Sequence, residues 1–294
     1  MRSKLFVPGI RPELYTKALA GEADALSFDL EDSVPESEKA QARRLVADFV
    51  GTREAREAAK LLIVRVNALN TPHFELDIDA LAKDGVALIN LPKVESAADV
   101  IAAVSALERA EAGNAIAQPI RLLVNIETPK ALRRAAAIAT AHPRVAGLQL
   151  GLGDLFAPLG IDRGDAANVH AAMFAVRMAA GEADLFVCDG AFADIDDDAG
   201  FRAEAEMAQR LGYVGKSCVH PRQVALANDV FRASDAELAA ALRIVAAAQA
   251  AAAQGRGAFV VDGRMIDLPF LKRAEAIVAA ARTEPSRPPI DAAR

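Results

Sequence analysis

The sequence is poor in cysteine and has no long uninterrupted apolar run. Its 294 residues include two cysteines, Cys188 and Cys218, which are too few for a disulfide framework and lack the spacing of a metal site. No apolar run reaches the roughly 18 to 20 residues that cross a bilayer. The short apolar patch near the N-terminus is interrupted by Pro8, so we expect neither a membrane span nor a signal peptide. These absences favour a cytoplasmic protein.

An excess of positive charge is also missing. Lys and Arg total 34 against 40 Asp and Glu, which gives a net charge of -6 and a pI near 5.4. This balance argues against nucleic acid as a partner, and a few local cations must hold any anionic substrate. With 53% hydrophobic and 25% charged residues, the chain has the composition of a globular protein with one large domain or two modest ones.

Eight short apolar runs alternate with segments of helical periodicity such as residues 37–50 and 96–110. The runs are apolar on both faces, which is typical of strands in a parallel sheet. Eight repeats of strand and helix predict an α/β fold of the (β/α)₈ TIM-barrel type. A doubly wound sheet would need a G-x-G-x-x-G turn after its first strand, and "VPGIRPEL" lacks it. The expected strands cover residues 4–9, 25–32, 61–67, 86–94, 120–128, 145–154, 185–190 and 213–221.

A further segment follows the predicted barrel, which would occupy residues 1–222. Residues 223–294 would form a C-terminal helical extension and lid, with a helix over 235–254, a turn at Asp262 and Gly263, and a last helix from about Leu268. The final stretch, "TEPSRPPIDAAR", is polar and rich in proline, so we expect it to fray.

Polar residues stand at the carboxyl ends of the predicted strands, where barrel enzymes assemble their active sites. Glu127 closes the fifth run and Asp154 the sixth, so their carboxylates would be neighbours. Such a pair repels unless a proton or a cation lies between, and an all-oxygen site suits Mg²⁺, with Mn²⁺ as an alternative. Either acid alone has a simpler interpretation as a cap of the following helix. The other polar residues at these ends are Asp29, Glu31, Asp32, Arg65, Asn67, Lys93, Asp189, Lys216 and His220.

Arg65 ends the third run and offers a planar, forked guanidinium to a carboxylate or acyl oxygen of a substrate. The alternative is an ion pair with Asp29 or Glu31. No Schiff-base lysine is required, because Lys93 and Lys216 are explained more simply as partners of phosphate or of an acid.

Seven motifs occur in a fixed order: "KLFVPG", "FDLEDSVP", "VRVN", "LPKVES", "IETPKAL", "GLGDL" and "GKSCVHPRQ". In this order they resemble the citrate lyase beta subunit-like family of the HpcH/HpaI aldolase superfamily, whose members include malyl-CoA and citramalyl-CoA lyases. The resemblance covers nearly the whole chain. The later segment "GAFVVDGRMIDLPFL" is similar to the C-terminal lid of the CoA-lyase members.

The resemblance implies a TIM barrel that assembles as a trimer or as pairs of trimers. It places Mg²⁺ on Glu127 and Asp154 and the substrate on Arg65 and Glu127. Asp267 would match the lid carboxylate that reaches into the site of a neighbouring subunit. Asp267 also precedes Leu268 and a proline, as an N-cap of the last helix would, and the two roles are compatible.

Supporting roles follow for other residues. Asp29, Glu31 and Asp32 would hold Arg65 and the waters of the metal. Arg11 and Lys17, just after the first strand, would bind the phosphates of CoA.

On this basis we expect reversible cleavage of a 3-hydroxy-3-carboxyacyl-CoA into a 2-oxo acid and acetyl-CoA. Arg65 would stabilise the oxygen of the thioester enolate, and Asp267 would exchange a proton with its carbon. Three alternatives stay open: a citrate lyase beta subunit acting on a citryl thioester of an acyl-carrier protein, a CoA-independent metal-dependent 2-oxo acid aldolase, and a non-catalytic subunit. One methyl group separates the malyl from the citramalyl substrates, so the sequence does not choose between them.

Overall fold

The computed structural model describes residues 1–116, 118–253, 255 and 257–283. The chain divides into two compact units, Met1–Phe231 and Arg232–Arg294. The division lies after α11 (Pro221–Val230), whereas the boundary expected between residues 222 and 223 falls inside this helix. The proline-rich stretch over residues 284–294, which we expected to fray, lies outside the described residues.

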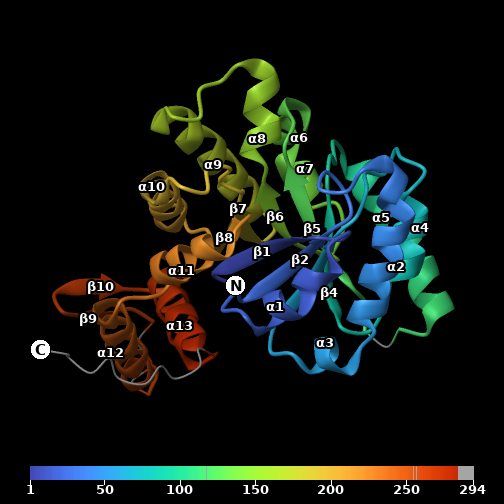
Figure 1. The fold of residues 1–294 in the computed structure, drawn as a ribbon. Helices are drawn as coiled ribbons and strands as arrows, with labels where there is room; N and C mark the ends of the chain where they lie inside the picture. The colour runs from blue at the N-terminus through green and yellow to red at the C-terminus, as the bar shows by residue number, and fades with distance from the viewer. Residues whose placement is uncertain (117, 254, 256, 284–294) are drawn as a thin grey trace, which may run out of the picture. The chain divides into compact units, whose positions relative to one another are not determined.

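Eight parallel strands close a barrel in the first unit, in sequential order, and β1 pairs with β8 to complete it (Figure 1). This confirms the predicted (β/α)₈ fold. Strands run in parallel because a helical crossover returns the chain to the same edge each time. The strands are β1 (Ser3–Pro8), β2 (Ala25–Asp29), β3 (Leu61–Arg65), β4 (Val86–Leu91), β5 (Arg121–Ile126), β6 (Val145–Leu150), β7 (Phe186–Asp189) and β8 (Gly215–Cys218).

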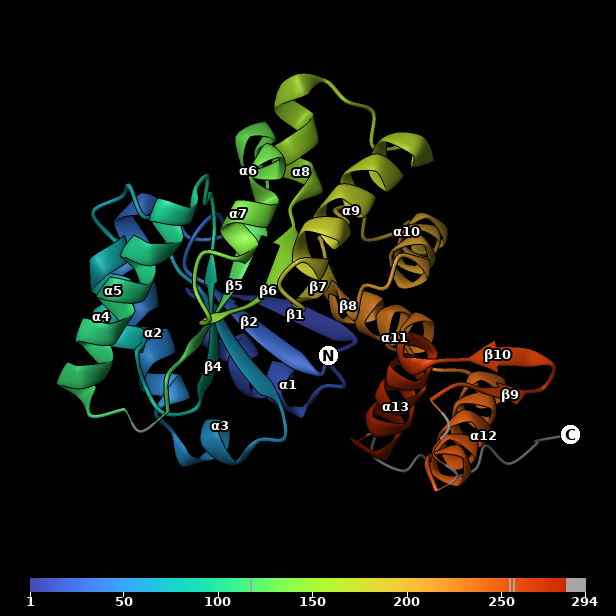
Figure 2. The same cartoon turned by 180° about the vertical axis from the view of Figure 1, so that it is seen from behind.

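Helices surround the strands, as the two opposite views show (Figures 1 and 2). Thr128 accepts a hydrogen bond from the N–H of Ala131 at 3.0 Å and so caps α6, which leaves the preceding Glu127 without a capping role. Besides α11, the helices are α1 (Tyr15–Ala20), α2 (Lys39–Val50), α3 (Arg53–Glu57), α4 (Phe74–Leu81), α5 (Ala97–Asn114), α6 (Pro129–Arg133), α7 (Ala135–Ala139), α8 (Leu152–Phe156), α9 (Ala166–Gly181) and α10 (Asp198–Arg210), with short 3-10 turns at Pro12–Leu14, Glu36–Glu38 and Ala157–Leu159.

The barrel interior changes character along its axis. Side chains alternate between the two faces of a strand, so residues such as Leu26 and Phe28 pack outward against the helices. A small apolar cluster forms the floor of the interior, and the residues two positions further along the same strands are polar. The floor contains Ala25, Ile63, Leu88, Leu123 and Ala146, and the next inward positions of four of these strands hold Ser27, Arg65, Asn90 and Asn125.

The second unit contains two helices and a hairpin. The helices α12 (Asp235–Ala252) and α13 (Leu268–Thr283) pack through Ala241, Ala274 and Val278. Strands β9 (Phe259–Val261) and β10 (Arg264–Ile266) pair antiparallel. Their turn places Asp262 and Gly263 at positive φ, which this type of tight hairpin requires. Across the described parts of both units, no helix has the length and apolar character needed to cross a membrane.

Candidate active site

The carboxyl ends of β2 and β3 place an arginine among three acids. Asp29 and Arg65 end their strands and are register partners. The guanidinium donates from Nε to Asp29 Oδ1 at 2.7 Å and from Nη2 to Asp29 Oδ2 at 2.8 Å, a bidentate pair. Its Nη1 lies 2.9 Å from Glu31 Oε2 and 3.2 Å from Asp32 Oδ2. The ion pair that the sequence allowed for Arg65 is formed, and the three acids fix the guanidinium.

These contacts set the protonation of the acids. Burial alone would raise the pKa of Asp29, but the charge and hydrogen bonds of Arg65 outweigh it and hold that pKa below its ordinary value. Burial raises the pKa of Glu31 to about 7, because attraction to Arg65 offsets it only in part. Glu31 is therefore an acid that titrates near neutral pH.

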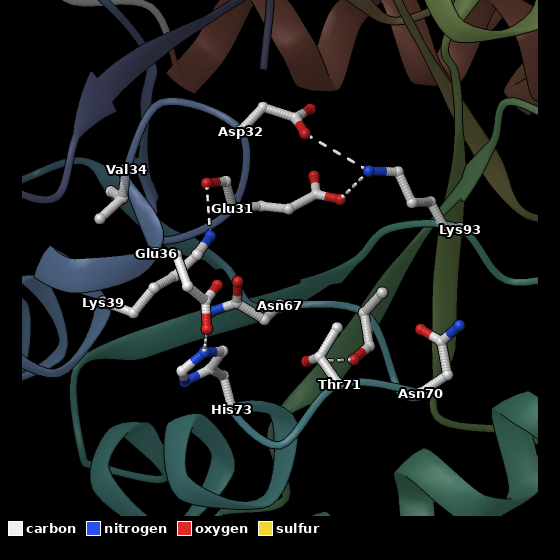
Figure 3. Close-up of a pocket in the computed structure, with 11 residues that line it drawn as sticks. Glu31, Asp32, Val34, Glu36, Lys39, Asn67, Asn70, Thr71, His73 and Lys93 are labelled. Atoms are coloured by element: carbon white, nitrogen blue, oxygen red, sulfur yellow. Dashed lines mark hydrogen bonds and ion pairs between the residues drawn. The ribbon is translucent and has the colours of Figure 1, made fainter.

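Lys93 connects this cluster to the fifth strand. Its Nζ lies 2.8 Å from Glu31 Oε1 and 3.3 Å from Asp32 Oδ1 (Figure 3). Its backbone N–H donates to Glu127 Oε1 at 2.5 Å. Lys93 has a φ of 53°, in the left-handed region that few residues other than glycine adopt. Backbone strain is therefore held at the residue that binds both Glu31 and Glu127.

Glu127 directly follows β5 and is 2% exposed. Its Oε2 accepts a hydrogen bond from Asn125 Nδ2 at 3.0 Å. The chain after β6 comes so close that a Cβ on Gly151 would stand 2.8 Å from Glu127 Oε2, so this position requires glycine. Burial raises the pKa of Glu127, the N–H of Lys93 offsets part of the rise, and the negative charge of Asp154 adds to it.

Asp154 does not close the sixth strand as expected. Strand β6 ends at Leu150, and Asp154 is the third residue of α8, in its first turn. The apolar run "LQLGLGDL" suggested a longer strand, but the chain turns into the helix at Gly151. The exposed carboxylate of Asp154 nevertheless lies near enough to Glu127 to affect its pKa.

The pair formed by Glu127 and Asp154 suits a hard divalent cation. Both side chains offer only oxygen, and the raised pKa of Glu127 means that its negative charge is not fully compensated by its neighbours. Among the described residues, no group of three or more His, Cys, Asp or Glu is arranged as a metal site. The pair would thus supply two ligands and leave the other positions to waters and substrate oxygens, which is usual for Mg²⁺.

A polar cavity of about 370 Å³ opens beside the acids. Figure 3 shows Glu31, Asp32 and Lys93 in its lining together with His73 and Thr71. The lining carries charges of both signs and several hydrogen-bonding groups, so the cavity favours a polar, charged ligand over an apolar one.

Two of the expected strand-end residues belong to a separate network. Lys216, the second residue of β8, is fully buried, and its Nζ lies 2.6 Å from Asp189 Oδ2 and 2.5 Å from Glu204 Oε1. Arg163 Nη2 lies 2.6 Å from the same Glu204 oxygen. The simpler interpretation of Lys216 as the partner of an acid is confirmed, whereas Asp189, expected among the convergent strand-end residues, instead binds Lys216 beside helix α10, which carries Glu204.

Other residues singled out in the sequence have structural contacts. Asn67 Nδ2 donates to Asp77 Oδ2 at 2.7 Å. His220 caps α11 by accepting the N–H of Arg222 at Nδ1, 3.3 Å away.

The two cysteines are free and buried. Burial raises the pKa of both thiols, which disfavours the reactive thiolate form.

The residues expected to bind CoA lie near the N-terminus of the sequence, whereas the residue expected to transfer a proton lies near its C-terminus. Arg11 is exposed and pairs with Glu13, and Lys17 is exposed on α1; their CoA-binding role stays a prediction. Asp267, in the second unit, accepts the N–H of Leu271 at its carbonyl, 3.0 Å away, and so marks the start of α13. Its buried Oδ1 makes no hydrogen bond with the described residues.

Three interior residues were missed in the sequence. Asn90 Nδ2 donates to Asn125 Oδ1 at 2.7 Å, and Asn125 in turn donates to Glu127, so a polar column leads to the proposed metal ligand. Lys4, on β1, also lies inside the barrel, with its Nζ over the ring of Phe6. In "VNIE" the polar residues Asn125 and Glu127 stand at alternate positions and so share a face, which is the signal for Asn125.

Comparison with known proteins agrees with this architecture. The family model described as HpcH/HpaI aldolase/citrate lyase matches residues 2–221. The chain is 40% identical to L-malyl-CoA/beta-methylmalyl-CoA lyase of Cereibacter sphaeroides, over 95% of this chain and 94% of that protein. It is 36% identical to (3S)-malyl-CoA thioesterase of the same species, over 95% and 96%. Protein CitE from Mycobacterium tuberculosis, solved in complex with magnesium, acetoacetate and coenzyme A, is similar with a TM-score of 0.73 and 32% identity, over 96% of this chain and 100% of that one. The chain belongs to the HpcH/HpaI aldolase/citrate lyase family.

Proposed function

We propose that the protein is a Mg²⁺-dependent carbon–carbon lyase that cleaves a 3-hydroxy-3-carboxyacyl-CoA, of malyl-CoA or citramalyl-CoA type, into a 2-oxo acid and acetyl-CoA, and that it catalyses the reverse condensation. The observation that carries this proposal is the buried carboxylate of Glu127, whose negative charge its neighbours do not fully compensate and which lies near Asp154. Lys93 connects Glu127 to Glu31, one of the acids that fix Arg65. A relative named as a malyl-CoA lyase and a similar structure containing magnesium and coenzyme A support it.

Residues of the barrel would prepare the substrate for cleavage. Mg²⁺ bound by Glu127 and Asp154 would supply Lewis-acid chemistry toward the carboxylate and hydroxyl oxygens of the substrate. The N–H of Lys93 and the amide of Asn125 hold the Glu127 carboxylate in one orientation. Orientation matters because a ligand that is fixed before the reaction need not reorganise during it.

Arg65 would stabilise the charge that appears on the leaving group. Asp29 binds its Nε and Nη2, while Nη1 lies beside Glu31 and Asp32, two of the residues that line the cavity. A donor at this place can bind the oxygen of the thioester enolate as negative charge moves onto it.

Asp267 would transfer the proton. In this proposal it protonates the enolate carbon during cleavage and removes a proton from acetyl-CoA during condensation. We propose a trimer or a hexamer in which the lid of one subunit completes the site of another. A fully active monomer at the assay concentration would contradict this assembly.

Asp267→Asn tests the proton-transfer role apart from metal binding. Deuterium exchange at the methyl group of acetyl-CoA should be strongly suppressed, while Mg²⁺ affinity measured by calorimetry stays at the wild-type value. Full activity in this variant would show that Asp267 does not transfer the proton and has only a structural role at the start of α13.

Product analysis of the purified protein tests the reaction itself. Malyl-CoA, 3-methylmalyl-CoA, citramalyl-CoA and citryl-CoA are each supplied with Mg²⁺, and then with EDTA. We expect acetyl-CoA, or propionyl-CoA from the 3-methyl substrate, together with a 2-oxo acid from at least one of them, and loss of this activity with EDTA. Cleavage of a free CoA thioester would also exclude an obligatory acyl-carrier protein and a CoA-independent aldolase.

Thioester hydrolysis is a second candidate function, favoured by the 36% identity to a (3S)-malyl-CoA thioesterase. Hydrolysis releases the thiol of CoA and malate, whereas the lyase reaction keeps the thioester bond in acetyl-CoA. Thiol titration alongside measurement of glyoxylate therefore separates the two. Thiol release without glyoxylate would replace the lyase by the hydrolase.

A further inference from the structure

The barrel interior contains a lysine below the proposed site. Lys4 is the second residue of β1 and is 0% exposed. Its Nζ lies 4.0 Å from the centroid of the Phe6 ring, and Arg65 Cζ lies 5.0 Å from the same centroid. Phe6 thus contacts two cations and connects Lys4 to the arginine that the carboxylates hold.

Lys4 is buried without a counter-charge bonded to it. Its Nζ makes no hydrogen bond with the described residues, whereas the equally buried Lys216 has Asp189 at 2.6 Å and Glu204 at 2.5 Å. An unpaired ammonium in a protein interior is unfavourable, and an apolar side chain of similar size would be more stable there. The stability of the fold therefore does not explain a charged side chain at Lys4.

The charged groups around Lys4 come from four other strands. Arg65 on β3 repels its ammonium, while the carboxylate of Asp29 on β2 attracts it. Cys188 on β7 and Cys218 on β8 would attract it only as thiolates, which their raised pKa values disfavour. Burial is the largest influence and lowers the pKa of Lys4 to about 8. The amine is protonated at neutral pH and loses its charge just above it.

The position of this charge suits the acidic rim. The rim has more carboxylates than cations, and such an excess weakens the binding of an anionic substrate in a low-dielectric site. A cation beneath the rim reduces the negative potential. Repulsion between Lys4 and Arg65 also favours the position in which the guanidinium binds Asp29, away from the barrel floor. The rim carboxylates are Asp29, Glu31, Asp32, Glu127 and Asp154, and its cations are Arg65 and Lys93.

We propose that Lys4 is a positioning residue of the reaction, whose ammonium acts through Phe6 to hold Arg65 at the rim and makes the site favourable to a carboxylate-bearing substrate. This inference rests on the proposed lyase function and adds a residue to it. Lys4 touches neither the substrate nor the metal in this scheme.

Lys4→Met tests the proposal because methionine is similar in size to lysine but carries no charge. We expect kcat/KM for thioester cleavage to fall at least about tenfold, a loss of about 1.4 kcal/mol in transition-state stabilisation, while the melting temperature rises. In the wild type, kcat/KM should decline as the pH increases through about 8, where the ammonium loses its proton. This decline should be absent in Lys4→Met.

Ser27→Ala is the matched control. Ser27 Oγ is another buried interior atom with no hydrogen bond among the described residues, and its strand position pairs with Phe6. Its removal deletes a polar atom but no charge. We expect wild-type kcat/KM and a wild-type pH profile.

The outcomes distinguish this inference from the function on which it rests. An active wild type with an equally active Lys4→Met variant, or with an unchanged pH profile in that variant, would overturn the role of Lys4 alone. A Lys4→Met variant that melts at a lower temperature or fails to fold would show that the lysine serves packing, which also overturns it. A wild type that cleaves none of the thioesters would overturn the lyase, and this inference with it.

Discussion

The barrel carries two groups of buried charges that are built differently. Along β7, β8 and α10, Lys216 and Arg163 meet Asp189 and Glu204, with two cations for two acids and separations of 2.5 to 2.6 Å. At the carboxyl ends of β2 to β6, acids outnumber cations, and a cavity opens beside Glu31 and Asp32. A balanced, closed network needs nothing further, whereas an acidic, open one requires a ligand to complete it.

Protonation follows this difference only in part. Burial would lower the pKa of Lys216, but Asp189 and Glu204 outweigh it and raise that pKa. Glu127 and Glu31 at the rim have raised pKa values because their burial is not matched by their partners. In the β7–β8 network burial also raises the pKa of Asp189, to about 6, but Lys216 and Arg163 lower that of Glu204. At the rim, a bound cation would relieve the repulsion between the carboxylates.

Removing the proposed metal ligand should produce the largest effect. Glu127→Gln keeps an acceptor for the N–H of Lys93 but removes the negative charge, so Mg²⁺ binding and turnover should both be lost. We expect kcat/KM to fall by about 1000-fold or more, equivalent to about 4 kcal/mol, in a protein that remains folded. Calorimetric titration with Mg²⁺ gives a readout independent of turnover.

A nearby surface acid provides the control for this variant. Glu95 pairs with Lys130 at 2.6 Å, and Glu95→Gln removes the same charge outside the proposed metal pair. Activity should stay near the wild-type value. If Glu127→Gln bound Mg²⁺ as tightly as the wild type, Glu127 and Asp154 would not be the metal-binding pair.

Breaking the balanced network should affect stability instead. Lys216→Met leaves Asp189 and Glu204 buried with less counter-charge, and loss of one partner from such a pair costs about 3 to 5 kcal/mol of unfolding free energy. Urea denaturation measures it. Lys4→Met should shift the unfolding free energy in the opposite direction, since that lysine has no bonded acid. If Lys216→Met lowered the unfolding free energy by less than about 1 kcal/mol, the balanced network would not be a stabilising element that differs from the rim.

Arg65→Lys should reduce activity by an intermediate amount. Lysine keeps the charge beside Asp29 but cannot form the bidentate pair and present a further donor at the same time. We expect kcat/KM to fall by about 100-fold, with KM less affected than kcat. Wild-type kcat in this variant would show that the guanidinium only balances the acids.

The smallest expected effect concerns the pH dependence of stability. The pKa of Glu31 rises from 4.5 to about 7 on folding, so the native state holds a proton that the unfolded chain releases between these values. The free energy of unfolding should therefore fall as the pH rises through this window. Glu31→Gln should lessen that fall and be more stable than the wild type at pH 8 by on the order of 1 kcal/mol.

Urea denaturation at pH 5 and pH 8 in EDTA measures this difference without a metal. A variant that gains as much at pH 5 as at pH 8 would mean that Glu31 is not the titrating acid.

Local sequence signals were sufficient for the barrel and its eight strands, but not for every strand end, since β2 ends at Asp29 and β6 at Leu150. Each strand is buried on both faces, so it appears as an apolar run whatever its neighbours are. Arg65 and Glu127 interrupt such runs at the point where the chain leaves the sheet, and they lie at the rim as expected. Asp154 was misplaced because an apolar run with glycines is compatible with both a strand end and the first turn of a helix.

The sequence by itself determined the fold class and the family, because hydrophobic periodicity and ordered motifs are properties of the chain read locally. Only the tertiary structure decided which polar groups meet. Asp189 ends β7 as Arg65 ends β3, yet it binds Lys216 beside α10, and Lys4 lies inside the barrel beneath Phe6. The reason is geometric: strand register and tilt fix which of two faces each side chain takes and which distant strand it meets, and a shift of one residue would reverse both.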